Sequence, residues 1–336
     1  MTRAREDTGA DLHADDAAAL EADLLAGFFD DPPTVPPRWF YDEKGSRLFD
    51  RITRLAEYYP TRAEAEILRA HAAAIVGDST TLVELGAGTS EKTRVLLDVL
   101  AGRDGGGVTG NGVAGGGPCT YVPVDISTEM LAESSRALAH DYPGLRIEPV
   151  VGDFVALDGP LPGEPGQRLV LFLGGTIGNF TEDQRAEFFA MLRRIASPGD
   201  RIAAGFDLVK SPERLVAAYD DAEGVTAEFN LNMLDVIAAT VPCSGLHRDN
   251  FRHEAVWNEQ CSRIEMWLRA VRDVRIDFPS LDLARTLAAG DGIRTEIARK
   301  FRIDDLVDEV SGHGFAGPGV WTDPAGDFGM VVAVVE

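Results

Sequence analysis

Short apolar runs alternate with helical patterns in the middle of the chain, from about residue 61 to residue 208. Apolar residues at helical spacing predict helices over residues 63–77, 90–101, 128–140 and 182–196. Apolar runs that predict strands lie between these segments: TLVELGAG, TYVPVDIS, RIEPVVGDF, RLVLFLGG and RIAAGFDLV. Such runs are apolar on both faces, as expected where helices cover both sides of a parallel sheet. The alternation predicts an α/β fold with a parallel, doubly wound sheet.

The N-terminal part of the chain has a different pattern. Residues 11–29 carry apolar groups at helical spacing on an acidic background, which predicts an amphipathic helix. We expect this helix to end before the prolines at positions 32, 33, 36 and 37, because proline enforces extended backbone in its neighbourhood. Six aromatic residues then follow within residues 39–59.

After about residue 208 the periodicity changes again. KSPERLVAAYDD and AEFNLNMLDVIAATV predict helices. Two longer segments predict antiparallel strands, with GDG as a turn in the second: FRHEAVWNEQCSRIEMWLRAVRDVRIDF and RTLAAGDGIRTEIARKF. FRIDDLVDEVSGHG predicts a further helix, and GMVVAVVE a last strand.

These patterns predict two domains in a chain of 336 residues. One is the sheet domain, residues 61–208 plus 300–336. The other is a discontinuous α+β domain, residues 10–60 plus 209–299. Residues 102–117 contain nine glycines in 16 positions, which predicts a flexible surface insert without a function of its own.

Composition and charge narrow the classes of function. The formal net charge is −23, which disfavours nucleic acid and anionic membranes as partners. The first residues are acidic and lack the apolar stretch of a secretory signal. The three cysteines and six histidines are scattered, with no spacing typical of a disulfide framework or a metal site. We expect a cytoplasmic protein without a metal.

A glycine-rich turn gives the sharpest local signal. Gly86 and Gly88 follow the first strand directly, where glycine lets the backbone approach a ligand and the next helix presents free N–H groups. A dinucleotide fingerprint needs a third glycine at position 91, which is Glu91 here. A nicotinamide-dependent oxidoreductase is therefore a weaker alternative.

Acidic residues follow the next two strands. Asp125 lies 39 positions after Gly86, or 23 when the 16-residue insert is subtracted, close to the ~20 expected for a ribose-binding carboxylate. Asp153 and Phe154 follow the third strand and could bind an adenine through its amine and its ring face. A GxG turn, an acid, and an acid–aromatic pair at three successive strand ends are the arrangement of S-adenosylmethionine methyltransferases.

Several long segments strengthen this interpretation, because together they resemble one family. The chain resembles the L-histidine Nα-methyltransferases of ergothioneine biosynthesis (the dimethylhistidine N-methyltransferase family) from about residue 32 to its C-terminus. The segments that carry the resemblance are WFYDEKGSRLFDRITRLAEYYPTRAEAEIL, LVELGAGTSEKTRVLL, FLGGTIGNF, AYDDAEGVTAEFN, RIEMWLRA and WTDPAGDFG. It implies a Rossmann-like domain that binds S-adenosylmethionine and a second, substrate-binding domain.

The resemblance also implies roles for individual residues. Tyr58, Asn179 and Tyr219 would hold the carboxylate of histidine. Tyr41 would lie near the amine and the methyl donor, with Phe49 and Gly174 beside it. Glu296 would accept the imidazole N–H, and Met266 would line the ring pocket. The cofactor would be held by Gly86, Gly88, Lys92, Asp125, Asp153 and Phe154.

The implied reaction is three successive methyl transfers from S-adenosylmethionine to the α-amine of histidine, giving hercynine. No histidine in the matching segments is an obvious base, so Tyr41 or water would relay the proton. The sequence departs from the family at two positions that usually hold serine, Gly175 and Ala298. Ala298 matters more, because that serine helps to grip the imidazole.

Alternatives remain at this stage. Ala298 keeps open an enzyme of the same class that acts on another, aromatic amino acid. A nucleotide-binding module without catalysis is a second alternative, disfavoured by the presence of both sets of binding residues. We expect a monomer.

Overall fold

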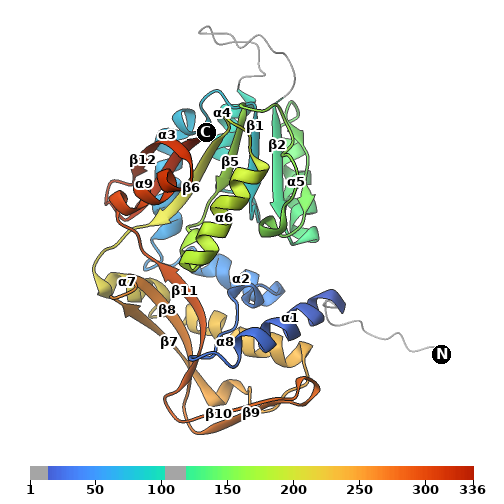
Figure 1. Cartoon of the computed structure of the whole chain (residues 1–336), viewed down its shortest axis with the longest axis vertical. Helices are drawn as coiled ribbons and strands as arrows, with labels where there is room; N and C mark the ends of the chain where they lie inside the picture. The colour runs from blue at the N-terminus through green and yellow to red at the C-terminus, as the bar shows by residue number, and fades with distance from the viewer. Residues whose placement is uncertain (1–13, 103–118) are drawn as a thin grey trace, which may run out of the picture. The chain divides into compact units, whose positions relative to one another are not determined.

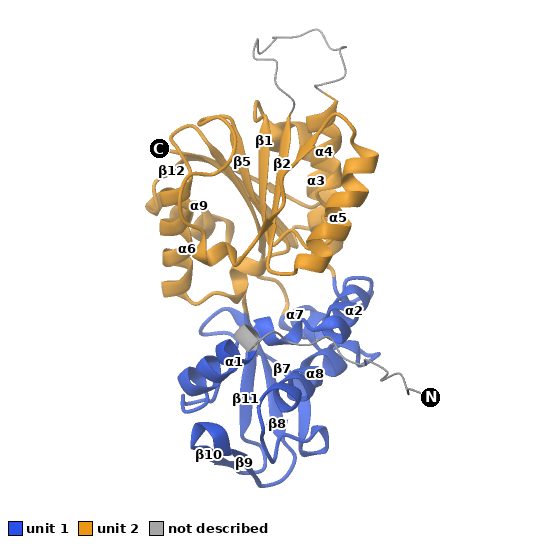
Figure 2. Ribbon diagram, turned by 90° about the vertical axis from the view of Figure 1, so that its right-hand side faces the viewer, with its two compact units in different colours: residues 1–58, 212–297 blue, residues 59–211, 298–336 orange. Residues whose placement is uncertain are grey.

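The structure is a computed structural model that describes residues 14–102 and 119–336. The glycine-rich insert expected at 102–117 therefore falls, apart from its first residue, outside the described part of the chain. The chain divides into two compact units, residues 1–58 with 212–297 (unit 1) and residues 59–211 with 298–336 (unit 2) (Figure 2). The roles expected of the two domains remain predictions.

Unit 2 is built on a central sheet. Its strands follow the order β12-β13-β6-β5-β1-β2-β3, with β4 pairing β2. The bounds are β1 (Thr81–Leu85), β2 (Thr120–Asp125), β3 (Arg146–Ile147), β4 (Val150–Val151), β5 (Arg168–Phe172), β6 (Arg201–Asp207), β12 (Phe315–Thr322) and β13 (Phe328–Val335). Strands β1 to β6 pair in parallel, whereas β13 is antiparallel to β6 and β12 to β13.

Helices cover both faces of this sheet. Figure 2 shows α6 and α9 on one side of it and α3, α4 and α5 on the other. Their bounds are α3 (Pro60–Val76), α4 (Arg94–Ala101), α5 (Thr128–Asp141), α6 (Glu182–Ile195) and α9 (Ile303–Gly312). Two short 3₁₀ turns belong to the same unit, η2 (Phe154–Ala156) and η3 (Thr176–Asn179). The predicted doubly wound α/β fold is confirmed.

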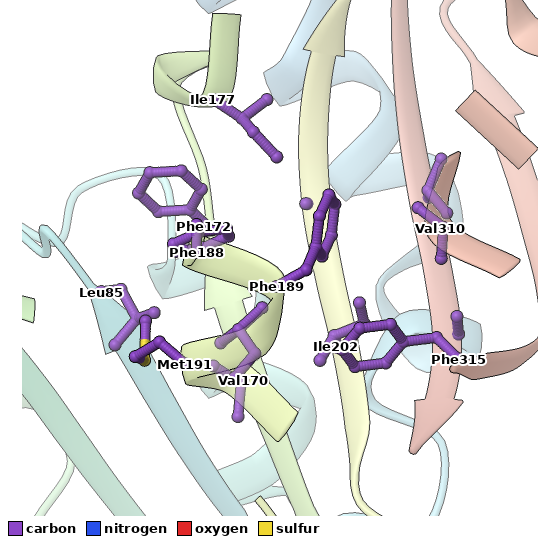
Figure 3. Close-up of a cluster of buried hydrophobic side chains, with 14 of the residues drawn as sticks. Leu85, Val170, Phe172, Ile177, Phe188, Phe189, Met191, Ile202, Val310 and Phe315 are labelled. Carbon is purple, nitrogen blue, oxygen red and sulfur yellow. The ribbon is translucent and has the colours of Figure 1, made fainter. Parts of the chain in front are cut away.

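The two faces of the sheet carry separate apolar cores. Alternate residues of a strand point to opposite faces, so Val83 joins the core under α6 and α9 while Leu82 joins the core under α3 and α4. In the first core, Phe172 of β5 packs against Phe188 of α6 with ring centroids 4.6 Å apart (Figure 3). Both strand faces are thus buried, which is why the strands are continuous apolar runs.

Two expectations about unit 2 are corrected, and one strand is additional. RIEPVVGDF is not one strand, because Pro149 lacks the N–H that a ladder needs and separates β3 from β4. The helix expected from residue 90 begins at Arg94, since Ser90 has a positive φ of 55°. Strand β12 was not expected, because Gly317 and Pro318 interrupt its apolar pattern where the ladder has a bulge.

Unit 1 combines helices with two small sheets (Figure 1). Its helices are α1 (Ala14–Gly27), α2 (Glu43–Ile52), α7 (Pro212–Tyr219) and α8 (Val225–Thr240), with 3₁₀ turns η1 (Pro37–Phe40), η4 (Arg248–Asn250) and η5 (Pro279–Leu281). Its strands are β7 (Phe251–Asn258), β8 (Arg263–Ala270), β9 (Val274–Phe278), β10 (Leu283–Leu287) and β11 (Gly292–Arg299). One sheet has the order β11-β8-β7 and the other pairs β10 with β9.

One strand pairing in unit 1 differs from the expectation. The strands on either side of GDG were expected to pair around that turn, but β10 and β11 belong to different sheets. Strand β10 pairs antiparallel with β9, which precedes it, so the turn at residues 279–282 makes the hairpin instead. Asp282 of this turn has a left-handed backbone.

None of the helices in residues 14–102 and 119–336 is long and apolar enough to cross a membrane.

Candidate functional site

The glycine-rich turn lies at the carboxyl end of β1, where the strand order reverses. The chain runs from β1 outward to β2 and β3 and then returns to β5 on the other side of β1. Ligands of open α/β sheets bind at such a switch point. Gly86 and Gly88 have φ values of +70° and +53°, so the turn needs residues without a side chain.

Asp125 connects this turn to the end of β2. Its Oδ2 accepts the N–H of Gly88 at 2.8 Å, and its Oδ1 accepts the N–H of Ser127 at 2.9 Å. The N–H of Gly88 is therefore committed to Asp125 rather than free for a ligand. A carboxylate has about four acceptor positions, so both oxygens can still bind hydroxyl groups.

Apolar side chains surround the end of the third strand. Asp153 is exposed and its Oδ1 accepts the N–H of Val155, which starts the turn η2. Phe154 is half-buried against Phe172, and a Cβ at Gly86 would lie 3.8 Å from its ring. Val151 and Val155 are exposed nearby in sequence, at 56% and 47%, and Ile126, 62% exposed, follows Asp125, which pairs with Val151. Exposed apolar residues beside a half-buried ring fit a flat aromatic base.

A hollow opens next to the glycine-rich turn. It is lined by the turn from Gly86 to Lys92 together with Glu84 and Leu173. Glu84 is 4% exposed and accepts hydrogen bonds from Thr93, at 2.6 Å, and from the hydroxyl of Tyr121. Burial raises the pKa of Glu84 to about 7, although both hydrogen bonds lower it.

Lys92 and Gly174 meet at the carboxylate of Glu64, also in unit 2. The Nζ of Lys92 lies 2.5 Å from Oε2 of Glu64, and the N–H of Gly174 donates to Oε1 at 2.7 Å. Gly174 has a φ of +86°, and Gly175 has a φ of +70°. A Cβ at Gly175 would lie 3.2 Å from the Phe328 ring, so a larger residue would require that ring to shift by a few tenths of an ångström. Asn179 ends the turn η3 that follows and is half-buried.

In unit 1, the segment before α2 fixes the position of Tyr41. Asp42 caps α2 by accepting the N–H of Gly45 at 2.7 Å, and it also accepts from the amide of Asn232 at 2.7 Å. Gly45 lies against the carbonyl of Phe40, which a Cβ would approach to 1.7 Å. The motif WFYDEKGS therefore packs the turn η1 closely against α2 and leaves Tyr41 between them, 44% exposed.

Four of the predicted substrate residues form a continuous row of rings within unit 1. Tyr41 contacts Phe49 edge to face at 5.6 Å between centroids, and Phe49 contacts Tyr58 at 6.3 Å. Tyr58 in turn contacts Tyr219 at 6.1 Å. Phe229 of α8 packs against both Tyr41 and Phe49. The structure thus brings Tyr41, Phe49, Tyr58 and Tyr219 together.

A buried polar network lies behind Tyr219. His253 of β7 is 2.8 Å from the Tyr219 carbonyl through Nε2 and 2.8 Å from the Asn230 amide through Nδ1. Thr295 of β11 donates to Oδ1 of Asn230 at 2.8 Å. Burial lowers the pKa of His253, so a neutral ring donates to the carbonyl at neutral pH.

The remaining predicted residues lie on the three-stranded sheet. Met266 of β8 is 2% exposed, and its carbonyl accepts the hydroxyl of Thr295 at 3.2 Å. Glu296 is half-buried on β11, and Ala298 is 3% exposed two positions later, on the same face of the strand. A serine hydroxyl at position 298 would thus be placed beside Glu296 along the strand.

The segments that carry these residues also match known proteins. Residues 20–335 match the model of the family described as histidine-specific, S-adenosylmethionine-dependent methyltransferases. The chain belongs to this family. No group of three or more potential metal-ligating side chains occurs in the part of the chain that the structure describes.

Curated relatives agree with the family. A Histidine N-alpha-methyltransferase of Mycolicibacterium smegmatis is 47% identical over 96% of this chain and 97% of its own length. A protein of the same name from Mycobacterium tuberculosis is 45% identical over 94% of both chains. Ergothioneine biosynthesis protein 1 of Neurospora crassa is 29% identical over 81% of this chain and 30% of its own length.

Some residues of the site were not anticipated from the sequence. Glu64 lies in an ordinary amphipathic helix and has no local signal. A carboxylate in an otherwise apolar strand could have indicated Glu84. Ile126 follows Asp125 directly, and its exposure is visible only in the folded chain.

Proposed function

We propose that this methyltransferase transfers three methyl groups from S-adenosylmethionine to the α-amine of L-histidine, giving hercynine in an early step of ergothioneine biosynthesis. The observation that carries the proposal is the match of residues 20–335 to the histidine-specific family. The substrate-binding motifs in WFYD, EYYPTR and AYDDAEG lie inside that match.

Residues of unit 2 would hold S-adenosylmethionine, and their surroundings fit its parts. Asp125 would accept the ribose hydroxyls. Phe154 would pack on the adenine with Ile126 beside it, and Asp153 would accept the adenine amine. Gly86 and Gly88 would give the backbone close approach, and Lys92 would face the methionine carboxylate at the hollow. The cofactor supplies a methyl group already activated by the sulfonium.

Histidine would be held by neutral groups at its carboxylate. Tyr58 and Tyr219, from the row of rings, would donate to it with Asn179, so no arginine is needed beside the cationic sulfonium. Glu296 would accept the imidazole N–H in a charge-assisted hydrogen bond, about twice as strong as a neutral one. Met266 and Phe49 would border the ring and the amine, with Gly174 beside them.

The protein's main contribution to catalysis would be alignment. Each transfer is an SN2 displacement, and holding amine, methyl and sulfur in line can contribute up to ~7–11 kcal/mol to lowering the barrier. The amine must lose a proton before it can attack. Tyr41 would relay that proton to water as a neutral phenol, because burial raises the pKa of Tyr41 well above its ordinary value and the negative charge of Glu296 raises it further.

The proposal extends to the partners and the location of the protein. We propose a monomer that acts in the cytoplasm and binds neither nucleic acid nor membranes. The net charge of −23 supports the absence of polyanionic partners. The three cysteines are free thiols, as is usual in a reducing compartment.

A second candidate substrate class is supported by Ala298. Without a hydroxyl at this buried position, one hydrogen bond to an imidazole is missing. The difference in binding free energy between histidine and apolar aromatic amino acids is therefore smaller. Such an enzyme would use the same cofactor residues and the same groups around the amine.

Incubation with a panel of amino acids distinguishes the two. Purified protein is given S-adenosylmethionine with a labelled methyl group and each amino acid separately, and the products are followed by mass. The proposal predicts mono-, di- and trimethylated histidine, ending in the trimethylated form. Preferred methylation of phenylalanine or tryptophan would favour the second candidate.

A further inference from the structure

Glu64 is a buried carboxylate to which the proposed chemistry gives no role. It lies in α3 between the core residues Ala63 and Ile67, and it is 0% exposed. Burying a carboxylate is costly unless charged or hydrogen-bonding partners compensate it. A helix that needed only to cover the sheet would place an apolar residue here.

The surroundings of Glu64 are built for a carboxylate. Its Oε2 lies 2.5 Å from the ammonium of Lys92, and its Oε1 accepts the N–H of Gly174 at 2.7 Å. Gly205 of β6 leaves the space for it, because a Cβ there would lie 2.3 Å from Oε1. Three separate segments of unit 2 thus meet at this one side chain.

One of the two donors, Lys92, lies at the wall of the hollow beside the glycine-rich turn, and the other, Gly174, lies next to it. Lys92 lines the hollow, and so does Leu173, which precedes Gly174. A Cβ at Gly174 would lie 3.5 Å from the Lys92 ammonium, so the two donors are close to each other. The Lys92 side chain is 31% exposed, which leaves the ammonium accessible from the hollow while Glu64 holds it from the protein side.

We propose that Glu64 is a positioning residue of the cofactor site: it fixes the Lys92 ammonium and the Gly174 backbone where the methionine end of S-adenosylmethionine binds. The inference rests on the proposed function and extends it to a residue outside the binding motifs. A lysine ammonium stands on a flexible four-carbon stem, and an ion pair from behind selects one position for it. The same pair reduces the positive charge that Lys92 brings near a sulfonium.

Glu64 also acts on the second buried carboxylate of this region. Burial is the main cause of the raised pKa of Glu84. The hydrogen bonds from Thr93 and Tyr121 and the positive charge of Lys92 lower this pKa, and the negative charge of Glu64 raises it by a smaller amount. Glu84 lines the same hollow, so its ionisation adds a negative charge beside the bound cofactor. Without the charge of Glu64, Glu84 ionises at a lower pH.

The test compares Glu64→Gln with Glu66→Gln. Glu66 lies on the same helix but is exposed, so the control changes the same charge without touching the site. Calorimetry measures the affinity for S-adenosylmethionine between pH 5.5 and about 8.5, a window around the pKa of Glu84. Steady-state kinetics measure the KM for histidine, and Glu64→Asp, whose carboxylate is one methylene shorter, is measured in parallel.

We expect Glu64→Gln to weaken cofactor binding about tenfold or more, as for a hydrogen bond to a charged group, with the histidine KM within about twofold of the parent. Cofactor affinity should change with pH as Glu84 ionises. The pH at which half of this change has occurred should be lower in Glu64→Gln than in the parent, and unchanged in Glu66→Gln. Glu64→Asp should keep the midpoint but lose part of the affinity. Replacing Lys92 by methionine should remove most of the effect of Glu64→Gln, because the two would act through one contact.

Cofactor affinity equal to the control in both Glu64 variants would overturn the inference. So would a chain that no longer folds with either change, because Glu64 would then be a residue of the core and not of the site. If the parent protein itself does not bind S-adenosylmethionine, the proposed function is wrong. That result is distinct from failure of the Glu64 inference, in which the parent binds the cofactor and the Glu64 variants bind it equally well.

Discussion

At the scale of single residues, the cofactor site is organised by carboxylates that hold backbone as well as ligand. Asp125 accepts N–H groups from Gly88 and Ser127, so its side chain joins the ends of β1 and β2. The sequence predicted its place at the strand end but not this second task. A loss of Asp125 would therefore disturb the turn and remove a ribose contact at once.

Asp125→Ala should weaken S-adenosylmethionine binding far more than histidine binding. A hydrogen bond to a charged group contributes ~1.5–3 kcal/mol, which corresponds to roughly ten- to over a hundredfold in affinity. Calorimetry of the folded variant measures the change, with Glu133→Ala on exposed α5 surface as the control. Unchanged cofactor affinity in Asp125→Ala would remove the ribose role.

Glu84 predicts a dependence of stability on pH. Its folded pKa of about 7 lies above the ordinary 4.5, so its contribution to stability is present below pH 4.5 and is lost as the pH rises to about 7. Glu84→Gln should thus match the parent near pH 5 and be more stable than it near pH 8, by up to a few kcal/mol. Denaturant unfolding at both pH values measures this. A stability difference that does not change with pH would mean that Glu84 stays ionised throughout.

At the scale of elements, the sequence predicted best where one element has one pattern. The runs of β1 and β5 are buried along their whole length, and both strands were found where expected. The errors occurred where a single residue overrides the pattern, as Pro149 does between β3 and β4. Which strands pair with each other was harder to predict than where the strands lie, because β10 has the same sequence pattern whether it pairs with β9 or β11.

In the candidate site, too, local patterns could be predicted from the sequence and long-range partners could not. Short motifs such as EYYPTR predicted positions, and the row of rings from Tyr41 to Tyr219 gives them a physical connection in unit 1. Long-range partners had no local signal. Asn230 and His253 lie in an apolar helix and a strand, and nothing in those patterns indicated that they meet behind Tyr219.

The network behind Tyr219 predicts the effect of Asn230→Leu. The change removes the partner of the His253 Nδ1 and one of the two acceptors of the Thr295 hydroxyl, and leaves both side chains buried. An unsatisfied buried polar group costs about 1–3 kcal/mol, so the free energy of unfolding should fall by at least that amount. If the network also places Tyr219, the histidine KM should rise while cofactor affinity stays near the parent value. Loss of cofactor affinity alone would contradict this placement.

At the scale of the whole molecule, the chain passes between its two units three times, after residues 58, 211 and 297. Tyr59, Lys210 and Lys300 lie within three residues of these points, and all belong to unit 2. Asp207 contacts all three: the Tyr59 hydroxyl at 2.8 Å and the two ammonium groups at 2.7 Å each. One buried carboxylate therefore anchors the chain on the unit 2 side of every passage.

Asp207→Asn should destabilise the protein by about 3–5 kcal/mol, because two buried ammonium groups lose their counter-ion. Burial alone would raise the pKa of Asp207, but Lys300 and Lys210 bring it below its ordinary value. Its contribution is therefore present at neutral pH and lost as the pH falls through the folded pKa. Denaturant unfolding should show a difference between parent and variant that shrinks in acid. The exposed Asp158→Asn should change stability by no more than ~0.5 kcal/mol, and an equal loss in both variants would contradict the anchor.

The most direct test of the account is the ratio of kcat/KM for histidine to that for phenylalanine, in the parent and in Glu296→Ala. The account predicts a parent ratio well above one. It predicts a fall of roughly tenfold or more in the variant, because a charge-assisted hydrogen bond of ~1.5–3 kcal/mol is lost for histidine only. Ala298→Ser should raise the ratio by up to about tenfold, the magnitude of one further hydrogen bond. A parent that prefers phenylalanine, or a ratio that Glu296→Ala leaves unchanged, would contradict the assignment of histidine as the substrate.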